Sequence, residues 1–402
     1  MSKEQEYLGK CFSQYYAKWQ PPISHVERRE FGFGNWQTKI AFRHLSFPNS
    51  GALSARLMRD APPYVSYSAA YYEFPDARPM PNKNWKGADL IFDLDAPAHT
   101  CGKFTCVECM GKIRGETIRL IEDFLVPDFG ISKDEMIVNF SGSRGFHVHV
   151  TSESVHNLRR EERREIVEYI NAASVSVKTL LHDDSRFIKE DETRKKVYKF
   201  YGPLVTDGGW RGKIAKRFLQ LVREKKLHEI GIPKKKAQEL YDNYGEVENT
   251  LKAPVKRMDG GVWANWTRIG LSGVYGKMFE ALVENTKVAI SADMDSNVTF
   301  DTSKLLRLPD SIHGGSGFAA RLCNDKGHTL FGKPTPKIEE FEPHVHAPVF
   351  SDEPLKMKII EEVPSVLLRS GQMSEKYAKD ALIEVPHYFG IYLMCKGAAI
   401  LA

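Results

Sequence analysis

The sequence predicts a mixed α/β fold of the α+β type, and three observations predict it. The segment 88–96, ADLIFDLDA, alternates side chains with the period of two expected of a strand. The segment 135–150, EMIVNFSGSRGFHVHV, indicates two strands joined by a tight glycine-containing turn. Between them, apolar residues from Gly111 to Leu125 recur at helical spacing. Strands and helices in this order favour a core of mixed secondary structure.

Composition bounds the class of protein. The chain has 402 residues, of which 42% are hydrophobic and 27% charged, as in an ordinary globular protein of one to three domains. No uncharged apolar run approaches the roughly 20 residues needed to cross a bilayer. The first ten residues lack the apolar core of a secretory signal. We therefore expect a cytoplasmic protein without membrane contact.

Positive charge is concentrated in one region. The net charge is +5, yet Lys189 to Lys236 alone carries fifteen Lys or Arg against six Asp or Glu. Clustered cations bind polyanions by releasing their counterions, so this region suggests a polyanionic partner. A solvated helical face is the alternative. From 206 to 285 the chain is basic and helix-like, and we expect an inserted helical subdomain there.

Two acids lie on the first predicted strand. Asp93 and Asp95 share one face, with Cα atoms roughly 7 Å apart. Paired carboxylates repel, and a divalent cation relieves that repulsion. Mg²⁺ and Mn²⁺ prefer oxygen ligands, and two such ions can stabilise the attacking and leaving oxygens of a phosphoryl transfer. Two solvated acids at a strand end are the alternative.

The turn of the predicted hairpin contains Ser141, Ser143, Arg144 and, just beyond it, His147. Small residues let the backbone approach a ligand, and turn N–H groups can bind an anion. Arg144 and His147 can donate charge-assisted hydrogen bonds to phosphate oxygens. A plain hairpin turn is the alternative. The chain has no Walker A sequence, so any nucleotide must be held by other means.

A third segment runs from Asp295 through DSNVTFDTSKLLRLPDSIHGGSG. Residues 288–295 alternate like a strand and place Asp293 and Asp295 on one face, where an acid could complete a three-carboxylate site. We expect Arg307 at the end of a short helical stretch and His313 in a glycine-rich turn, both able to reach a triphosphate.

Together, FDLD, SGSRGFHVH and the third segment resemble the small, catalytic subunit of the archaeal and eukaryotic DNA primases. Their order and spacing agree with that family. Weaker similarities lie in IAFRHLSF (40–47), in SAAYYEFP (68–75) and in VPHYFGIYLMCKGA (385–398), which is similar to archaeal members. The resemblance therefore covers nearly the whole chain.

The resemblance implies a primase fold: a mixed sheet with an RRM-like half, a zinc knuckle at about 98–111 and a helical insertion. The catalytic core would span 1–205 and 286–402, interrupted by the basic insertion 206–285. The implied activity is template-dependent nucleotidyl transfer, making short RNA primers on single-stranded DNA for replication. Use of deoxynucleotides stays open. A large regulatory subunit carrying an iron–sulfur domain is the implied partner in a heterodimer.

The resemblance also implies residue roles. Asp93, Asp95 and Asp295 would hold two catalytic Mg²⁺ or Mn²⁺ ions, with Asp293 as the competitor for the third position. The phosphates of the nucleoside triphosphate would contact a set of polar residues: Ser141, Ser143, Arg144, His147, Arg307 and His313. Ser143 stands where eukaryotic members carry a second arginine, which fits the archaeal type. Arg43 matches a basic position near the active site.

A zinc site is expected directly after the first strand. Cys101, Cys106 and Cys109 lie within nine positions, and His99 precedes them. Thiolate and imidazole ligands on a short loop suit tetrahedral structural zinc, and the family carries a knuckle at this place. Three free thiols are the alternative.

Two other functions remain open from the sequence. One is a repair or end-joining primase-polymerase of the same superfamily, which would depend on a primer. The other is a non-catalytic, zinc-bearing subunit that only binds nucleic acid, for which loss of Asp95 would change no activity.

Overall fold

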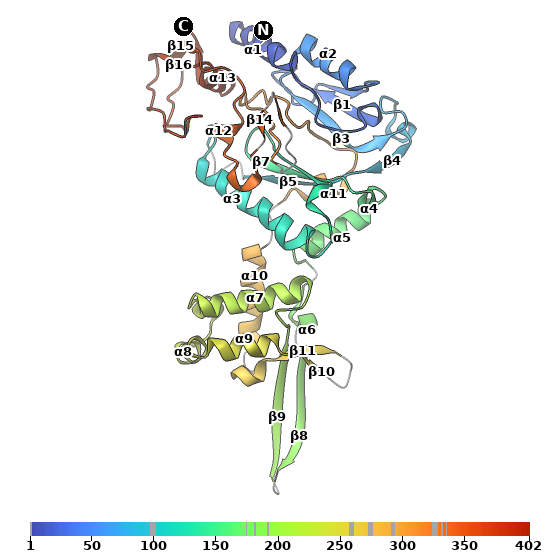
Figure 1. Ribbon diagram of the computed structural model, residues 1–402, viewed down its shortest axis with the longest axis vertical. Helices are drawn as coiled ribbons and strands as arrows, with labels where there is room; N and C mark the ends of the chain where they lie inside the picture. Colours follow the sequence, from blue (N-terminus) through green and yellow to red (C-terminus); the bar gives the residue numbers. More distant parts are fainter. Residues whose placement is uncertain are drawn as a thin grey trace. The chain divides into compact units, whose positions relative to one another are not determined.

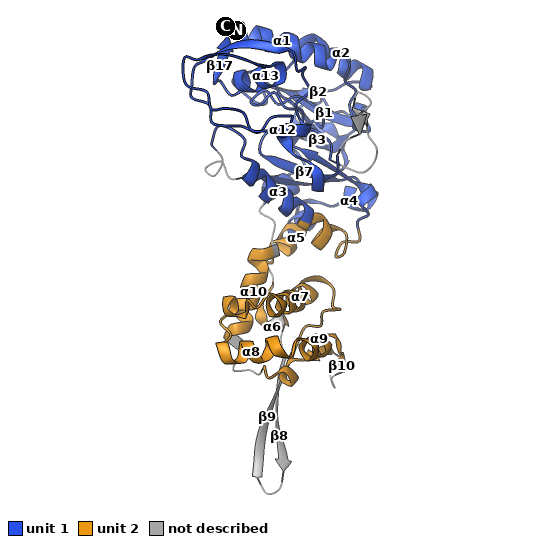
Figure 2. Ribbon diagram, turned by 60° about the vertical axis from the view of Figure 1, so that its left-hand side comes forward, with its two compact units in different colours: residues 1–118, 131–165, 293–402 blue, residues 119–130, 166–292 orange. Residues whose placement is uncertain are grey.

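The computed structural model describes residues 2–96, 102–173, 175–180, 182–190, 193–256, 261–271, 276–290, 294–323, 329–330, 333–334 and 336–402. It divides into two compact units, coloured separately in Figure 2. Unit 1 comprises 1–118, 131–165 and 293–402, and unit 2 comprises 119–130 and 166–292.

The first sheet of unit 1 is antiparallel, in the order β12-β3-β1-β2, with β4 also paired to β3 (Figure 1). Its strands are β1 (Arg29–Phe33), β2 (Phe42–Leu45), β3 (Val65–Tyr72), β4 (Trp85–Ala88) and β12 (Leu305–Arg307). Every residue of β1 and β3 is buried. The late strand β12 therefore returns to a sheet built from the first ninety residues.

The second sheet carries the predicted motifs. Its order is β5-β7-β6, with β5 at Leu90–Asp95, β6 at Met136–Phe140 and β7 at Gly145–Val150. The strands predicted at 88–96 and 135–150 are thus confirmed. The antiparallel register places Asp93 opposite His147 and Asp95 opposite Gly145. Apolar side chains on all three strands are buried, so this register is fixed by the core.

The remaining elements of unit 1 flank these sheets. Its longer helices are α1 (Lys3–Tyr16), α2 (Ser50–Asp60), α3 (Val107–Arg119), α5 (Arg160–Ile170), of which only the first part belongs to this unit, and α13 (His387–Cys395). Its short helices are α4 (Glu153–His156), α11 (Ser296–Phe300) and α12 (Pro343–His346). The C-terminal sheet is β16-β15-β17, formed by β15 (Pro354–Ile359), β16 (Leu382–Pro386) and β17 (Ala399–Leu401). Two short strands, β13 (Thr329–Leu330) and β14 (Lys333–Pro334), form a separate pair.

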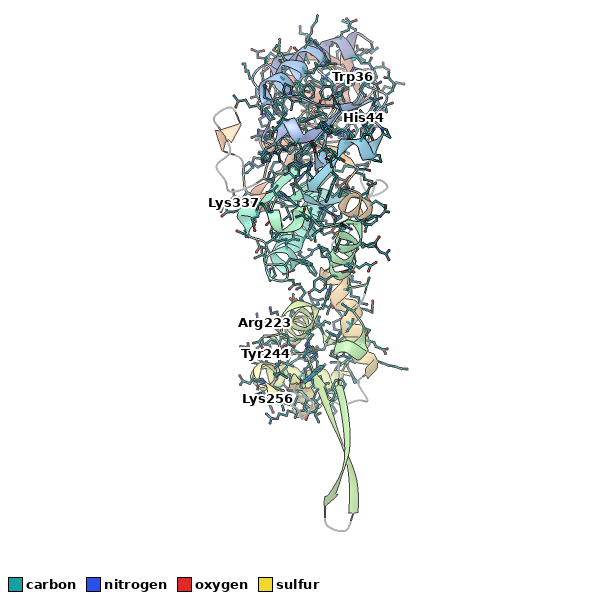
Figure 3. All side chains as sticks on the ribbon, turned by 90° about the vertical axis from the view of Figure 1, so that its right-hand side faces the viewer. Trp36, His44, Arg223, Tyr244, Lys256 and Lys337 are labelled. Carbon is teal, nitrogen blue, oxygen red and sulfur yellow. The ribbon has the colours of Figure 1, made fainter. Side chains whose placement is uncertain are left out.

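Unit 2 has its own hydrophobic core, in which Phe218, Trp266 and Phe279 are fully buried. Its helices are α6 (Val177–Leu180), α7 (Gly209–Arg223), α8 (Lys234–Asp242), α9 (Tyr244–Lys252) and α10 (Gly276–Ile290). Its sheet has the order β10-β11-β9-β8, formed by β8 (His182–Glu190), β9 (Thr193–Gly202), β10 (Val255–Lys256) and β11 (Val262–Asn265). Figure 3 shows Arg223 beside Tyr244 in this unit, where its Nη2 donates to the tyrosine hydroxyl at 3.0 Å.

The helix predicted from Gly111 to Leu125 is confirmed, since α3 continues as a π-helical turn over Leu120–Leu125. The helical unit has other bounds than 206–285: it takes in 119–130 and 166–292 and includes a four-stranded sheet. The strands β8 and β9 were not expected, because charged residues recur on both of their faces and hide the alternation.

Two local predictions were wrong. Residues 288–290 belong to helix α10 and not to a strand, because Leu282, Val283 and Thr286 bury one helical face. Arg307 lies on β12 and not at a helix end, because residues 305–307 pair with β3. The described strand pairs are all antiparallel, so the fold is α+β, whereas the resemblance implies a mixed sheet. No described helix combines the length and the apolar character needed to span a membrane.

Candidate active site

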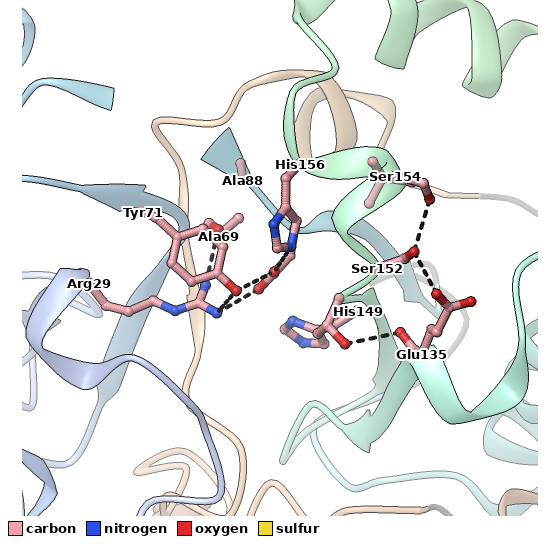
Figure 4. Close-up of polar contacts among 12 residues, drawn as sticks. Arg29, Ala69, Tyr71, Ala88, Glu135, His149, Ser152, Ser154 and His156 are labelled. Carbon is pink, nitrogen blue, oxygen red and sulfur yellow. Dashed lines mark hydrogen bonds and ion pairs between the residues drawn. The ribbon is translucent and has the colours of Figure 1, made fainter. Parts of the chain in front are cut away.

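A buried ion pair anchors the start of β5, the strand that carries the two acids. Arg29 Nη2 lies 2.8 Å from Asp89 Oδ2, and the Tyr71 hydroxyl donates to Asp89 Oδ1 at 2.7 Å (Figure 4). Burial alone would raise the pKa of Asp89, but Arg29, His156 and Tyr71 lower it to about 2. The carboxylate therefore stays ionised, and its hydrogen bonds hold the strand that follows.

Asp93 and Asp95 differ in their surroundings although they share a strand face. Asp93 is largely buried, and His147 Nε2 lies 3.3 Å from its Oδ1. Burial raises the pKa of Asp93, but the charge and hydrogen bond of His147 outweigh this and lower it. The pKa of Asp95 is raised by desolvation and by the charge of Asp93. The two carboxylates thus oppose each other's ionisation, as a cation-binding pair would.

Gly145 makes room for the Asp95 carboxylate. A Cβ atom on Gly145 would lie 2.0 Å from Asp95 Oδ1 and 2.1 Å from the carbonyl oxygen of Leu94. Neither distance is compatible with a side chain, so the glycine is required by the close approach of β5 and β7.

Asp295, 200 residues after Asp95 in the sequence, lies beside the pair. Its backbone N–H donates to the carbonyl oxygen of Asp93 at 3.0 Å. It caps α11, where its Oδ1 accepts from the N–H of Asn297 at 3.0 Å, and Lys304 Nζ lies 3.7 Å from its Oδ2. The structure therefore places the backbone of Asp295 next to the strand that carries Asp93 and Asp95. Asp293, the competitor for the third position, lies outside the described residues.

The donor set suits a hard divalent cation. All three side chains offer carboxylate oxygens, which Mg²⁺ and Mn²⁺ prefer. Asp93 Oδ1 is buried and lies 3.3 Å from His147 Nε2, and a carboxylate oxygen has a second lone pair that can bind a cation. Within the described ranges, no three acidic, cysteine or histidine side chains are already gathered as a metal site. Ligation by Asp295 would therefore replace its contacts with Asn297 and Lys304.

The turn between β6 and β7 is held by the loop that contains His313. Ser141 Oγ accepts from the N–H of Gly145 at 3.1 Å, so its own hydroxyl proton is left to donate elsewhere. Gly142 has φ +84, and a Cβ there would lie 2.7 Å from His313 Cβ. Ser316 Oγ donates to the carbonyl oxygen of Gly142 at 2.5 Å. The turn and the late loop therefore form one surface.

Arg307 and His313 meet at Tyr64. The Arg307 guanidinium lies 5.1 Å from the ring centroid of Tyr64, and the His313 ring lies 5.3 Å from it, edge on. Burial lowers the pKa of Arg307 to about 10, so it stays charged at neutral pH. Burial, together with the charges of Arg307 and two lysines, holds the pKa of His313 well below its ordinary value. His313 is therefore a neutral donor or acceptor and not a cation.

The polar contacts of Arg43 are with other residues of the protein. Its Nε lies 2.7 Å from Oε1 of the fully buried Glu30, and its Nη2 donates to the carbonyl oxygen of Ser303. No contact given for the described residues joins Arg43 to Asp93 or Asp95. Ser303 directly precedes Lys304, whose Nζ lies 3.7 Å from Asp295 Oδ2, so Arg43 lies at the edge of the site.

The match to known proteins agrees with this geometry. The model of the family described as DNA primase small subunit matches residues 92–323. The DNA primase small subunit PriS of Methanococcoides burtonii is 32% identical over 411 residues, which cover 99% of this chain and 98% of that protein. Its counterpart in Methanothrix thermoacetophila is 32% identical over 418 residues, with 99% of both chains covered. The chain belongs to the DNA primase small subunit family.

A third relative is similar over nearly its whole length. The DNA primase small subunit PriS of Thermoplasma volcanium is 29% identical over 400 residues, covering 98% of this chain and 97% of that protein. The segment matched by the family model begins one residue before Asp93 and contains Asp95, the 141–147 turn, Asp295, Arg307 and His313. The resemblance to the small primase subunit is thus confirmed as membership.

The expected zinc knuckle is only half described. His99 and Cys101 lie outside the described residues. Cys106 directly precedes α3, and its Sγ accepts from the N–H of Cys109 at 3.4 Å. This hydrogen bond, with the Cys109 side chain, lowers the pKa of Cys106, which favours the thiolate that a metal requires. The assignment of zinc stays a prediction.

Two cations near the acids were missed in the sequence. Lys39, in the loop before β2, lowers the pKa of both Asp95 and His313 through its charge. Lys304 does the same for Asp93. Both are single lysines in polar loops, without any motif to mark them. Only the fold brings them to the site.

Proposed function

We propose that this chain is the catalytic subunit of a DNA primase, a nucleotidyltransferase that makes short RNA primers on single-stranded DNA. The relatives it matches along nearly their whole length carry the name DNA primase small subunit. The observation that carries the proposal is the hydrogen bond from Asp295 to Asp93, which supports a shared role for acids far apart in the sequence.

In this proposal Asp93, Asp95 and Asp295 hold two Mg²⁺ or Mn²⁺ ions. Bound there, such ions would lower the pKa of the attacking hydroxyl and offset the charge that develops on the phosphate oxygens. His147 keeps Asp93 ionised, and Gly145 leaves space for the Asp95 carboxylate. These two residues prepare the ligands, and His147 is also proposed to donate a hydrogen bond to the phosphates.

The reaction forms a bond between a 3′ oxygen and the α-phosphorus of a nucleoside triphosphate. The bond from that phosphorus to the bridging oxygen breaks, pyrophosphate leaves with the electron pair, and the hydroxyl proton passes to water. We propose that Arg144 and Arg307 neutralise the charge of the phosphates. Ser141 and His313 form hydrogen bonds to the phosphates as neutral groups. Such fixed donors align the phosphates for in-line attack without reorganisation.

Zinc is proposed as a structural ion. His99, Cys101, Cys106 and Cys109 would close the loop that precedes α3, a segment too short to have a core. Metal analysis of the purified chain should give one zinc per chain, and Cys106→Ser with Cys109→Ser should abolish it. A zinc-free wild-type chain with full activity would contradict the assignment.

We also propose that the chain works in a heterodimer with a large regulatory subunit and that unit 2 contributes to binding the template backbone. Contacts to phosphates position a nucleic acid without reading its sequence. Support comes from the basic surface of unit 2, where Lys216, Lys234 and Lys235 are exposed and have no ion pair with a described residue.

The test is template-dependent incorporation of labelled nucleotides without any primer, compared between wild type and Asp93→Ala. We expect synthesis by the wild type and near-total loss in the variant, with DNA binding retained. Strict dependence on an added primer would favour the repair polymerase. Unchanged activity of the Asp93→Ala and Asp95→Ala complexes would favour the non-catalytic subunit.

A further inference from the structure

A small polar cavity of about 270 Å³ opens beside the turn between β6 and β7, within unit 1. We call it the basic cavity. Its walls include Ser143 and Arg144 from the turn, Gly315 from the late loop, Lys103 from the segment before α3, and Lys396 from the end of α13. Four segments that are distant in the sequence thus converge on one space.

Among the described residues, three cations and no acid line the basic cavity. Lys103 is neutralised outside it by Glu361. Arg144 and Lys396 form no ion pair with any residue the structure describes. The Lys396 ammonium lies 5.4 Å from the ring centroid of Tyr392, which positions it but does not neutralise it.

The position of Lys396 disfavours its charged form. Burial, together with the charges of Arg144 and Lys103, lowers its pKa to about 8. Cations brought together away from solvent repel one another, and a bound anion reverses the sign of that interaction. The arrangement is therefore typical of an anion site and not of a packing contact.

The size and place of the basic cavity restrict the anion. Its volume is below the roughly 300–1,000 Å³ of pockets that enclose a whole small-molecule ligand. It adjoins Ser143 and Arg144, in the turn that carries Ser141, and Gly315, two residues after His313. The occupant is therefore the phosphate end of a ligand whose remainder lies toward the carboxylates.

We propose that the basic cavity binds the terminal phosphates of the incoming nucleoside triphosphate, and that Lys396 and Lys103 make the enzyme select triphosphates over monophosphates. This inference rests on the proposed function. It assigns a binding role to the C-terminal segment, which the sequence motifs leave without one. Pyrophosphate, the leaving group, would be held by the same cations.

The test compares Lys396→Gln with wild type in the full chain, by measuring the dissociation constants of ATP, ADP and AMP calorimetrically. We expect ATP binding to weaken at least tenfold and AMP binding less than twofold, and Lys396→Arg to restore most of the affinity for ATP. The KM for nucleotides should rise by a similar factor, with a smaller change in kcat. Inorganic triphosphate should compete with ATP for the wild type and much less for the variant.

The matched control is Lys379→Gln, an exposed lysine of the same C-terminal segment, which should change none of these constants. Lys103→Gln gives a second variant, expected to weaken ATP binding less because Glu361 already pairs with it. Equal loss of ATP and AMP binding, or none, in a folded Lys396→Gln chain would overturn the inference. A wild type that binds ATP but incorporates no nucleotide would instead overturn the proposed function.

Discussion

Replacing Gly145 by alanine should disable the candidate active site through a single methyl group. The added Cβ would lie 2.0 Å from Asp95 Oδ1 and 2.1 Å from the Leu94 carbonyl oxygen. Rotation of the Asp95 side chain can relieve the first contact, but the second involves backbone. The strands β5 and β7 must therefore separate by about 1 Å or more to restore ordinary contact distances.

The size of the effect follows from that displacement. Overpacking of this kind costs about 1–3 kcal/mol in the free energy of unfolding. A shift of about 1 Å in a catalytic group costs roughly a hundredfold in rate. We expect Gly145→Ala to fold, with its urea midpoint lowered, and to lose at least a hundredfold of primer-free nucleotide incorporation.

Gly9→Ala is the matched control. Gly9 lies within α1, and a Cβ there would meet no atom within 4 Å. The substitution should raise the free energy of unfolding by about 1 kcal/mol, because alanine favours helix more than glycine does, and leave incorporation unchanged. Wild-type stability and activity in Gly145→Ala would refute the close approach of Asp95 to β7.

The free energy of unfolding should depend on pH through His149, whose burial lowers its pKa to about 3. Below pH about 6.5 the unfolded chain binds this proton and the folded chain does not, so stability falls as the pH drops from 7 to 5. Urea denaturation of His149→Gln should show a slope reduced by up to about 1.4 kcal/mol per pH unit, and an unchanged slope would contradict the burial. Arg29→Met, which strands the buried Asp89 charge, should lower the free energy of unfolding by about 3–5 kcal/mol, and Arg29→Met with Asp89→Leu should recover part of it. A loss below 1 kcal/mol in the single variant would show that the pair is not buried. Binding of single-stranded DNA should depend less on salt when three cations that form no ion pair in the described chain are replaced by Gln, namely Lys225, Lys234 and Lys235. The slope of log Kd against log salt concentration should decrease by about 2. The matched control set consists of cations that form ion pairs, and replacing them should change this slope less: Arg211, Lys213 and Arg217. Equal effects of the two sets would contradict the assignment of DNA binding to the unpaired cations.

The parts of the fold that local patterns determine could be predicted from the sequence. The strand with Asp93 and Asp95 and the hairpin around Arg144 are where the alternation places them, since side chains of period two fix both element and register. From the residues alone, Asp293 or Asp295 could only be suggested as a partner of this strand, and the family resemblance favoured Asp295. No periodicity could specify a hydrogen bond between residues 202 positions apart.

Where the predictions were wrong, tertiary contacts determined the local structure. The alternating pattern across 288–295 is short, and burial of the helical face of α10 that contains Leu282 and Thr286 outweighs it. Arg307 lies in a strand because residues 305–307 pair with β3. Lys39 and Lys396 could not be found, because an isolated lysine has no sequence signature until the fold brings it to a site.

If Asp93, Asp95 and Asp295 bind the same cations, each of the three carboxylates should contribute to the affinity for Mn²⁺. Titration of the full chain with Mn²⁺, followed by the loss of the free-ion electron paramagnetic resonance signal, tests it most directly. We expect Asp295→Asn to weaken Mn²⁺ binding at least tenfold, as Asp95→Asn should. Asp380→Asn, at an exposed acid that pairs with Lys358, should leave it unchanged. Full Mn²⁺ affinity in Asp295→Asn would contradict the account.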